Sequence, residues 1–214
     1  MTRVTAAAAW VAAGAAVAAS VGDLLLLAVA TPATPALALG TALGRRALVV
    51  GHYLGVLAIP LYALGYRYVG SRLGDPYGRL LTALGVCGGV VGGTIHGVTS
   101  VAIAAGSLGA ATEFGSSPIP LSSPFAAYIL PLWAIVTSAV LAASVIFTTA
   151  VVRGSGDYRR SMALASPAVL TIAIGTCASI SSASRALVTP AAPNLAHIAF
   201  FVLASANCTR RWTA

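Results

Sequence analysis

Four ionisable side chains lie inside long apolar runs of the sequence. They are Asp23, His52, His96 and His197. An ionisable group within a membrane helix is energetically costly and commonly marks a functional site. A carboxyl group in an apolar site can hold a proton and act as a general acid, and a neighbouring histidine can orient or accept that proton. These residue types therefore predict acid–base chemistry inside a membrane.

The elements that must position these side chains are apolar runs. Hydrophobic residues make up 58% of the 214 residues and charged residues only 7%, and the mean hydropathy is +0.93. Soluble domains carry about 25% charged residues, so a cytosolic globular enzyme and a disordered chain are both excluded. Runs long enough for a spanning helix of about 20 residues cover 6–30, 47–66, 80–105, 125–152, 161–188 and 193–209. We therefore expect an all-α bundle of about six transmembrane helices, as a single integral membrane domain over 1–214.

The basic residues predict the orientation of this bundle. All twelve are arginines, and nine fall at the termini or in the second–third and fourth–fifth connections. Only Arg45, Arg46 and Arg185 fall on the opposite side. Positive charge is enriched on the cytoplasmic side of membrane proteins, so both termini are predicted to be cytoplasmic. The richness in Ala, Gly and Arg is typical of a high-GC, bacterial genome, which predicts a bacterial cell membrane.

Scattered arginines at helix ends indicate a lipid bilayer as the surroundings, and no nucleic-acid partner is expected. Glycines recur every fourth residue over 85–97. Such a stripe lets a neighbouring helix approach closely, and packing within the chain is favoured over a dimer contact. The oligomeric state stays open.

With this topology the four ionisable side chains all fall in the outer half of the membrane. Further polar and aromatic groups at the same depth are candidates for substrate binding. They are Tyr53, Tyr128, Trp133, Ser181 and Arg185, with Glu113 in the outer loop 106–124, which could close over the site as a lid. His197 is a candidate for substrate binding as well. Tyr62, Tyr66, Tyr68 and Tyr77 are instead expected in the interfacial aromatic belt on the inner side.

The sequence lacks the motifs that are typical of several other kinds of catalytic site. The sequence has no HExxH, HxxxH or CxxC pattern for a metal, no GxSxG elbow for a serine hydrolase and no aspartate-rich motif for magnesium and diphosphate. We therefore expect neither a metal nor a cofactor. Acid–base chemistry on an apolar substrate remains, with Asp23 as proton donor and His52 and His96 orienting or accepting the proton. Aromatic faces such as Tyr53 and Trp133 could stabilise a cation.

Two short motifs carry a resemblance to a known family. Gly22-Asp23 and Gly51-His52-Tyr53, in a small all-helical chain without a diphosphate motif, resemble the small bacterial membrane-bound terpene cyclases. These include the drimentine-type cyclases, which act on farnesylated indole diketopiperazines. The resemblance implies protonation-initiated cyclisation of a farnesyl chain on an apolar or prenylated indole substrate, an isomerase or lyase reaction of secondary metabolism. Fungal relatives use paired acids, and Glu113 would be the second acid here.

Three other functions are compatible with the same residues. A proton-coupled small-molecule transporter uses intramembrane aspartate and histidine side chains as a proton relay. A membrane lipid hydrolase or epoxide-opening enzyme is a second alternative, and a structural or assembly protein is a third. A polar path through the whole membrane would favour transport, whereas a pocket closed towards the cytoplasm would favour an enzyme.

The predicted orientation can be tested by labelling single cysteines in intact cells. In a variant whose three native cysteines are replaced by serine, a cysteine at Ser155 is expected to react only with a membrane-permeant maleimide. A cysteine at Ser116 is expected to react also with an impermeant one, because its loop is predicted to face outwards. The opposite labelling pattern would invert the orientation.

Overall fold

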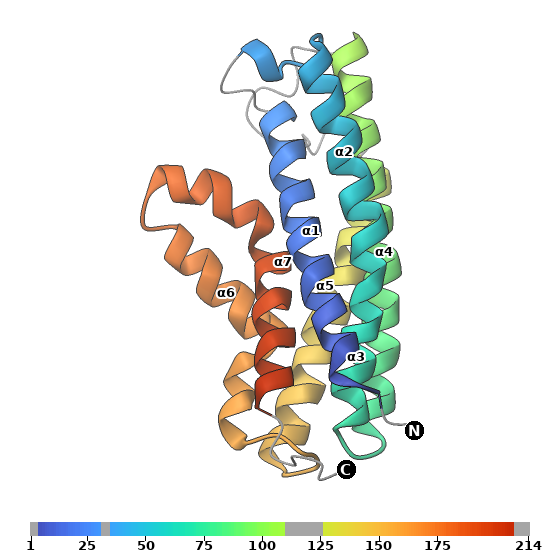
Figure 1. Ribbon diagram of the computed structural model, residues 1–214, viewed down its shortest axis with the longest axis vertical. Coiled ribbons are helices and arrows are strands. Elements are labelled where there is room, and N and C mark those ends of the chain that lie inside the picture. Colours follow the sequence, from blue (N-terminus) through green and yellow to red (C-terminus); the bar gives the residue numbers. More distant parts are fainter. Residues whose placement is uncertain (1–3, 31–34, 110–125, 208–214) are drawn as a thin grey trace.

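Every regular element that the structure describes is helical (Figure 1). The structure is a computed structural model, and it describes residues 4–30, 35–109 and 126–207, with backbone only at 106–109, 126 and 182–187. The helices are α1 (Ala6–Ala30), α2 (Ala42–Ala58), α3 (Tyr62–Ser71), α4 (Tyr77–Gly109), α5 (Ala126–Val152), α6 (Pro167–Ala178) and α7 (Ser182–Ala206). Short 3-10 helices are η1 (Pro35–Leu37), η2 (Ile59–Leu61) and η3 (Arg160–Ala165). The expected all-α class is confirmed.

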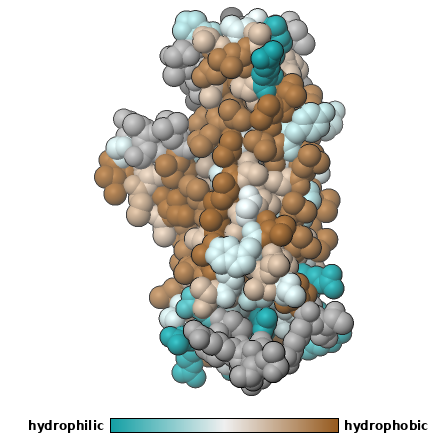
Figure 2. Space-filling view, viewed as in Figure 1, coloured by the Kyte–Doolittle hydropathy of each residue, from teal (hydrophilic) through white to brown (hydrophobic). Residues whose placement is uncertain are grey.

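Five stretches of the described chain are long and apolar enough to cross a membrane. They are Ala6–Ala30, Ala42–Ser71, Tyr77–Ala105, Ala127–Val152 and Val188–Ala206. Large apolar side chains lie on their outer faces, where Leu57 is 67% exposed and Val145 64% exposed. Figure 2 shows this apolar surface along the length of the bundle, with hydrophilic atoms towards its two ends. The chain is therefore a polytopic membrane bundle whose outer surface suits lipid.

The second span is one helical element with a 3-10 turn in its middle. Pro60 cannot donate a backbone hydrogen bond, and the chain narrows to the 3-10 turn η2 between α2 and α3. The span then continues to Ser71, so it is longer at both ends than the predicted run 47–66. Tyr62 and Tyr66 of α3 are buried in the bundle, where they are 4% and 3% exposed.

The predicted run 161–188 is not a single helix. It contains η3, the short helix α6, a turn at 179–181 and the start of α7. Twelve residues of α6 extend about 18 Å, less than the roughly 30 Å of a bilayer core. The serine-rich stretch after Ala178 ends this helix, since serine side chains compete for backbone hydrogen bonds. Figure 1 shows α6 and the first turns of α7 leaning away from the other helices.

The last helix begins earlier than the predicted start at 193. Pro190 and Pro193 both lie inside α7. Membrane helices tolerate proline where neighbouring groups satisfy the freed backbone. α1 begins and α7 ends at the same end of the bundle (Figure 1), in keeping with termini that share one side. Which side that is stays a prediction.

Glycines and alanines let the helices approach closely. A Cβ atom at Gly85 would overlap the Tyr66 ring, and Cβ atoms at Gly89 and Gly93 would lie 3.2–3.3 Å from Pro60. The glycine stripe of α4 therefore packs within the chain, against η2 and α3. Nearer the termini, buried alanines of α1 pack with the aromatic side chains Tyr68, Phe147, Phe200 and Phe201. This half of the bundle is a filled core.

Substitution of Gly65 tests this packing. A Cβ atom there would lie 2.5 Å from Phe201 Cε1 and 2.7 Å from Ala12 Cβ. Overpacking of this kind costs about 1–3 kcal/mol, so Gly65→Ala is expected to lower the midpoint of thermal unfolding in detergent. Gly14 has no atom within 4 Å of the corresponding position, and Gly14→Ala should be neutral or slightly stabilising. Equal midpoints for the two variants would contradict the close contact.

Candidate functional site

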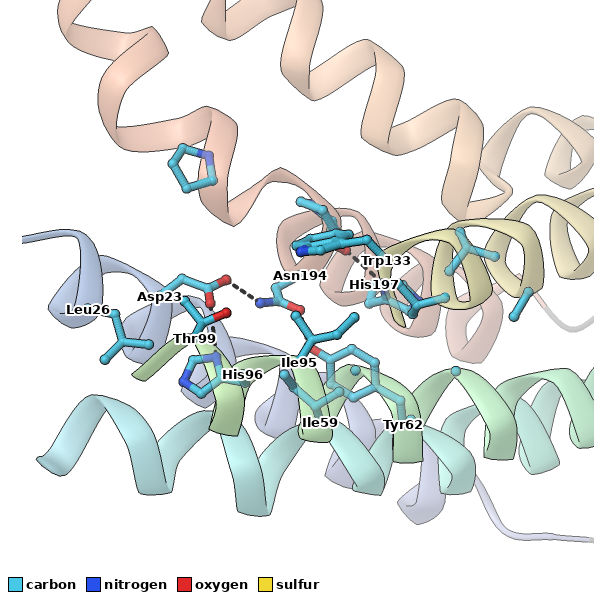
Figure 3. Close-up of a pocket in the computed structure, with 18 of the residues that line it drawn as sticks. Asp23, Leu26, Ile59, Tyr62, Ile95, His96, Thr99, Trp133, Asn194 and His197 are labelled. Atoms are coloured by element: carbon cyan, nitrogen blue, oxygen red, sulfur yellow. Dashed lines mark hydrogen bonds and ion pairs between the residues drawn. The ribbon is translucent and has the colours of Figure 1, made fainter. Parts of the chain in front are cut away.

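A pocket of about 510 Å³ lies between α1, η2, α3, α4, α5 and α7. This volume is within the range of sites for small molecules, roughly 300–1,000 Å³. Most lining side chains are apolar, and its ionisable or hydrogen-bonding groups are few. The groups that form hydrogen bonds or an ion pair with one another are Asp23, Tyr62, Tyr66, His96, Asn194 and His197. Figure 3 shows Asp23, His96 and Asn194 converging from three different helices.

An aspartate–histidine contact is the centre of this group. Asp23 Oδ1 of α1 lies 3.3 Å from His96 Nδ1 of α4. The other ring nitrogen, His96 Nε2, donates to the Gly51 carbonyl oxygen of α2 at 2.9 Å. His96 is 5% exposed, and the Asp23 side chain is 21% exposed. Three helices thus fix one imidazole ring, with one nitrogen on a backbone carbonyl and the other on a carboxyl group.

Three glycines make room for this contact. A Cβ atom at Gly55 would overlap the His96 ring, and one at Gly22 would lie 3.0 Å from the Gly51 oxygen. The missing side chains let α1 and α2 approach closely. They also leave a notch on α2 into which α4 inserts the imidazole. Gly51 and Gly55 are therefore part of the site although they have no functional side chain.

Asn194 links the carboxyl group to a tyrosine. Its Nδ2 donates to Asp23 Oδ2 at 2.6 Å, and its Oδ1 accepts from the Tyr62 hydroxyl at 2.7 Å. The amide side chain is thereby fixed in one orientation, because only its nitrogen can donate and only its oxygen can accept. Both oxygens of Asp23 have a polar partner within an apolar pocket.

A second histidine lies one turn further along α7. His197 Nδ1 donates to the Pro193 carbonyl oxygen at 2.7 Å. Its Nε2 therefore accepts, and the Tyr66 hydroxyl donates to it at 2.9 Å. The Tyr62 ring lies over His197 with ring centroids 4.8 Å apart. This pair lies beside the Asp23–Asn194–Tyr62 chain, nearer the end of the bundle that carries the termini.

The pocket is closed towards that end by aromatic packing. The Tyr66 ring contacts Phe200 and Phe201 with centroids 5.9 and 5.6 Å apart. Phe200 in turn packs against Phe147 at 5.1 Å, and all three phenylalanines are fully buried. Along α4 the pocket extends from Leu84 to Ile103, so it spans the middle of the bundle. The position of the site in the outer half of the membrane stays a prediction.

The structure brings together four of the predicted site residues. Asp23, His96, His197 and Trp133 all line the pocket. They come from α1, α4, α7 and α5, so their meeting depends on the tertiary fold. Within the described ranges no three His, Cys, Asp or Glu side chains come close enough to hold a metal ion.

Other predicted residues lie elsewhere. His52 is not among the lining residues. Its Nδ1 lies 2.5 Å from Ser100 Oγ, and its ring contacts Tyr53 edge-on at 5.0 Å. Tyr53 and Tyr128 are 57% and 70% exposed on the outer surface. Ser181 is exposed in the turn before α7.

Three further predictions concern residues that the structure does not describe. Of the predicted outer loop 106–124, residues 106–109 continue α4, and 110–124 with Glu113 lie outside the described residues, as does the side chain of Arg185.

Sequence reasoning missed three site residues. Tyr62 and Tyr66 were placed in the interfacial belt, which is wrong, because both are buried and line the pocket. Their spacing of four puts both on one helix face, a signal compatible with either location. Asn194 lies within the predicted run 193–209, but it was not among the predicted site residues. An asparagine within an apolar run was the available signal.

The chain was compared with known proteins. Residues 4–211 match DUF6796, a family of unknown function. The chain belongs to this family. No curated protein and no solved structure matches it. The comparisons therefore establish membership of a family of unknown function, and the resemblance to membrane-bound terpene cyclases gains no support from them.

Removing the Tyr62 hydroxyl tests the polar chain in this DUF6796 member. Tyr62→Phe leaves the Asn194 oxygen without its donor in apolar surroundings, which is expected to cost about 0.5–2 kcal/mol. Reversible unfolding in mixed micelles measures this free energy. Tyr53→Phe is the matched control, since the Tyr53 side chain lies on the outer surface, and it should change the free energy of unfolding by less than about 0.5 kcal/mol. Equal effects would contradict the hydrogen bond.

Proposed function

We propose that this protein is an integral membrane enzyme that protonates an apolar substrate, with the Asp23–His96 pair as proton donor. The contact between Asp23 Oδ1 and His96 Nδ1, with His96 Nε2 on the Gly51 carbonyl oxygen, carries this proposal. A carbonyl oxygen can only accept, so Nε2 holds a proton. Two states of the Nδ1 contact are then favourable. A neutral carboxyl group donates to a neutral imidazole, or a carboxylate accepts from an imidazolium. In both states one proton lies between the two groups.

The pocket around this proton supports an apolar substrate. Apart from the polar groups already described, the lining consists mainly of leucine, isoleucine, valine, alanine, glycine and proline residues. The rings of Tyr62, Tyr66 and Trp133 also line it, and aromatic faces stabilise cations where water is excluded. An acid, aromatic rings and an apolar wall fit the cyclisation of a prenyl chain.

In the proposed reaction the proton adds to one carbon of a terminal alkene of a farnesyl-type substrate. The electron pair of that double bond forms the new C–H bond and leaves a tertiary carbocation. The next double bond attacks this cation and closes a ring. Loss of a proton to a base in the pocket ends the reaction, so substrate and product are isomers. Asp23 is the donor, His96 orients it, and His52 supports the α2 segment that holds His96.

The closed end of the pocket supports an enzyme over a proton-coupled transporter. The buried rings of Phe147, Phe200 and Phe201 lie between the pocket and the end of the bundle with the termini. A transporter needs a polar route to both sides of the membrane. The contact between His52 and Ser100 lies outside the pocket lining, which disfavours a serine hydrolase built on that pair.

Replacement of the proposed donor tests the function. Asp23→Asn keeps the size of the side chain but removes its transferable proton, so the yield of cyclised product should fall by on the order of 10²–10⁴-fold. The measurement is incubation of detergent-purified protein with farnesylated indoles, followed by chromatography and NMR, because an isomeric product has an unchanged mass. Asp75→Asn is the control, since Asp75 lies in an exposed pair with Arg79. Near-wild-type yield with Asp23→Asn would contradict the assignment.

A further inference from the structure

The pocket combines one acid with aromatic rings and a side opening. Asp23 is the acidic residue of the lining, and no arginine lines the pocket in the described part of the chain. The Tyr62 ring and Trp133 line the same space (Figure 3). A positive centre is stabilised by a carboxylate and by aromatic faces, and most strongly where water is excluded. The electrostatics of the pocket therefore favour a cation.

The opening of the pocket faces the apolar surface of the bundle. Trp133 on α5 and Thr189 and Pro190 on α7 line the pocket and are also exposed. Thr189 and Pro190 belong to the N-terminal part of α7, whose first turns lean away from the other helices (Figure 1). A molecule with a hydrocarbon skeleton can reach the pocket through this opening from the membrane interior. A strongly hydrated inorganic cation cannot use such a route at a comparable cost.

We infer that the pocket binds a lipophilic ammonium ion, which takes the place of the proton shared by Asp23 and His96. The positive nitrogen pairs with the Asp23 carboxylate and lies against the Tyr62 and Trp133 rings, while the hydrocarbon part fills the apolar lining. This inference rests on the proton assigned to the Asp23–His96 pair under the proposed function, but it does not require cyclisation.

The exchange conserves charge in the pocket. Before binding, the pair with its one proton is neutral, whether the proton is on the carboxyl group or on the imidazole. After binding, the carboxylate and the ammonium ion sum to zero and His96 keeps only its Nε2 proton, still donated to Gly51. One proton therefore leaves to water for each ammonium ion bound. Two cationic charges in an apolar site would be far more costly.

A quaternary ammonium ion is the sharpest probe of this exchange. Geranyltrimethylammonium has a fixed charge, so any released proton must come from the protein. Calorimetry of detergent-purified protein in two buffers with different ionisation enthalpies is expected to show release of about one proton for each ion bound. The affinity should then rise about tenfold with each unit of pH while the pair retains its proton. Binding without proton release would overturn the inference. This measurement uses the wild-type protein, so it does not depend on the folding of a variant.

Paired variants locate the binding site. Asp23→Asn should weaken binding roughly 30-fold or more and abolish proton release, whereas Asp75→Asn should change neither. Gly88 lines the pocket and has no atom within 4 Å of its Cβ position, so Gly88→Leu is expected to fill the pocket and block binding. Gly14→Leu, with equal space on the outer face of α1, should bind as the wild type does. Equal affinity of these two leucine variants would overturn the location.

The fluorescence of Trp133 gives an independent readout. In a Trp10→Phe, Trp212→Phe background, Trp133 is the remaining tryptophan, and its emission should shift when geranyltrimethylammonium binds. Geraniol serves as the neutral arm and is expected to bind without proton release and without dependence on Asp23. Ammonium binding with proton release but no cyclised product would remove the proposed reaction and leave this inference intact. Cyclisation without Asp23-dependent ammonium binding would overturn this inference and leave the proposed reaction intact.

Discussion

The close approach of α1 and α2 is the constraint on which the site depends. Gly22 of α1 faces Gly51 and Gly55 of α2, and a Cβ atom at any of these positions would meet the neighbouring helix or the His96 ring. Only this spacing brings the Gly51 carbonyl oxygen within 2.9 Å of His96 Nε2 while Asp23 Oδ1 is 3.3 Å from Nδ1. Since a carbonyl oxygen can only accept, the backbone contact fixes Nε2 as the donating nitrogen and leaves Nδ1 facing the Asp23 carboxyl group.

The bundle divides its two tasks along its length. Near the termini, small α1 side chains pack closely against Phe147, Phe200, Phe201 and Tyr68, and the interior is filled. Further along, where the first turns of α7 lean away from the other helices, the bundle contains the pocket. A filled half supplies the packing that drives association of helices in lipid. It also holds Tyr66 and His197 beside the hydrogen-bonded chain Asp23–Asn194–Tyr62.

The sequence predicted a shared depth for the site residues, and only the tertiary structure shows which of them meet. Asp23, His96 and His197 were expected at one depth because each lies at a known distance from the end of an apolar run. The structure puts all three on one pocket. His52 has a comparable depth, but it is turned towards Ser100 on the far side of the α2–α4 contact. Asn194 and the two tyrosines also line the pocket, and the local sequence pattern did not predict that their side chains face it.

Composition and the lengths of apolar runs determined by themselves that this is an all-α membrane protein, because insertion into a bilayer depends on local hydropathy and backbone hydrogen bonding. The tertiary structure alone decided which face of each helix turns inwards. In a soluble helix the polar face marks the outside, but here lipid and protein interior are both apolar, so the pattern carries little information on rotation about the helix axis. That rotation is set by contacts between distant residues, such as glycines against an imidazole, and it is why His96 lies on the pocket and His52 does not.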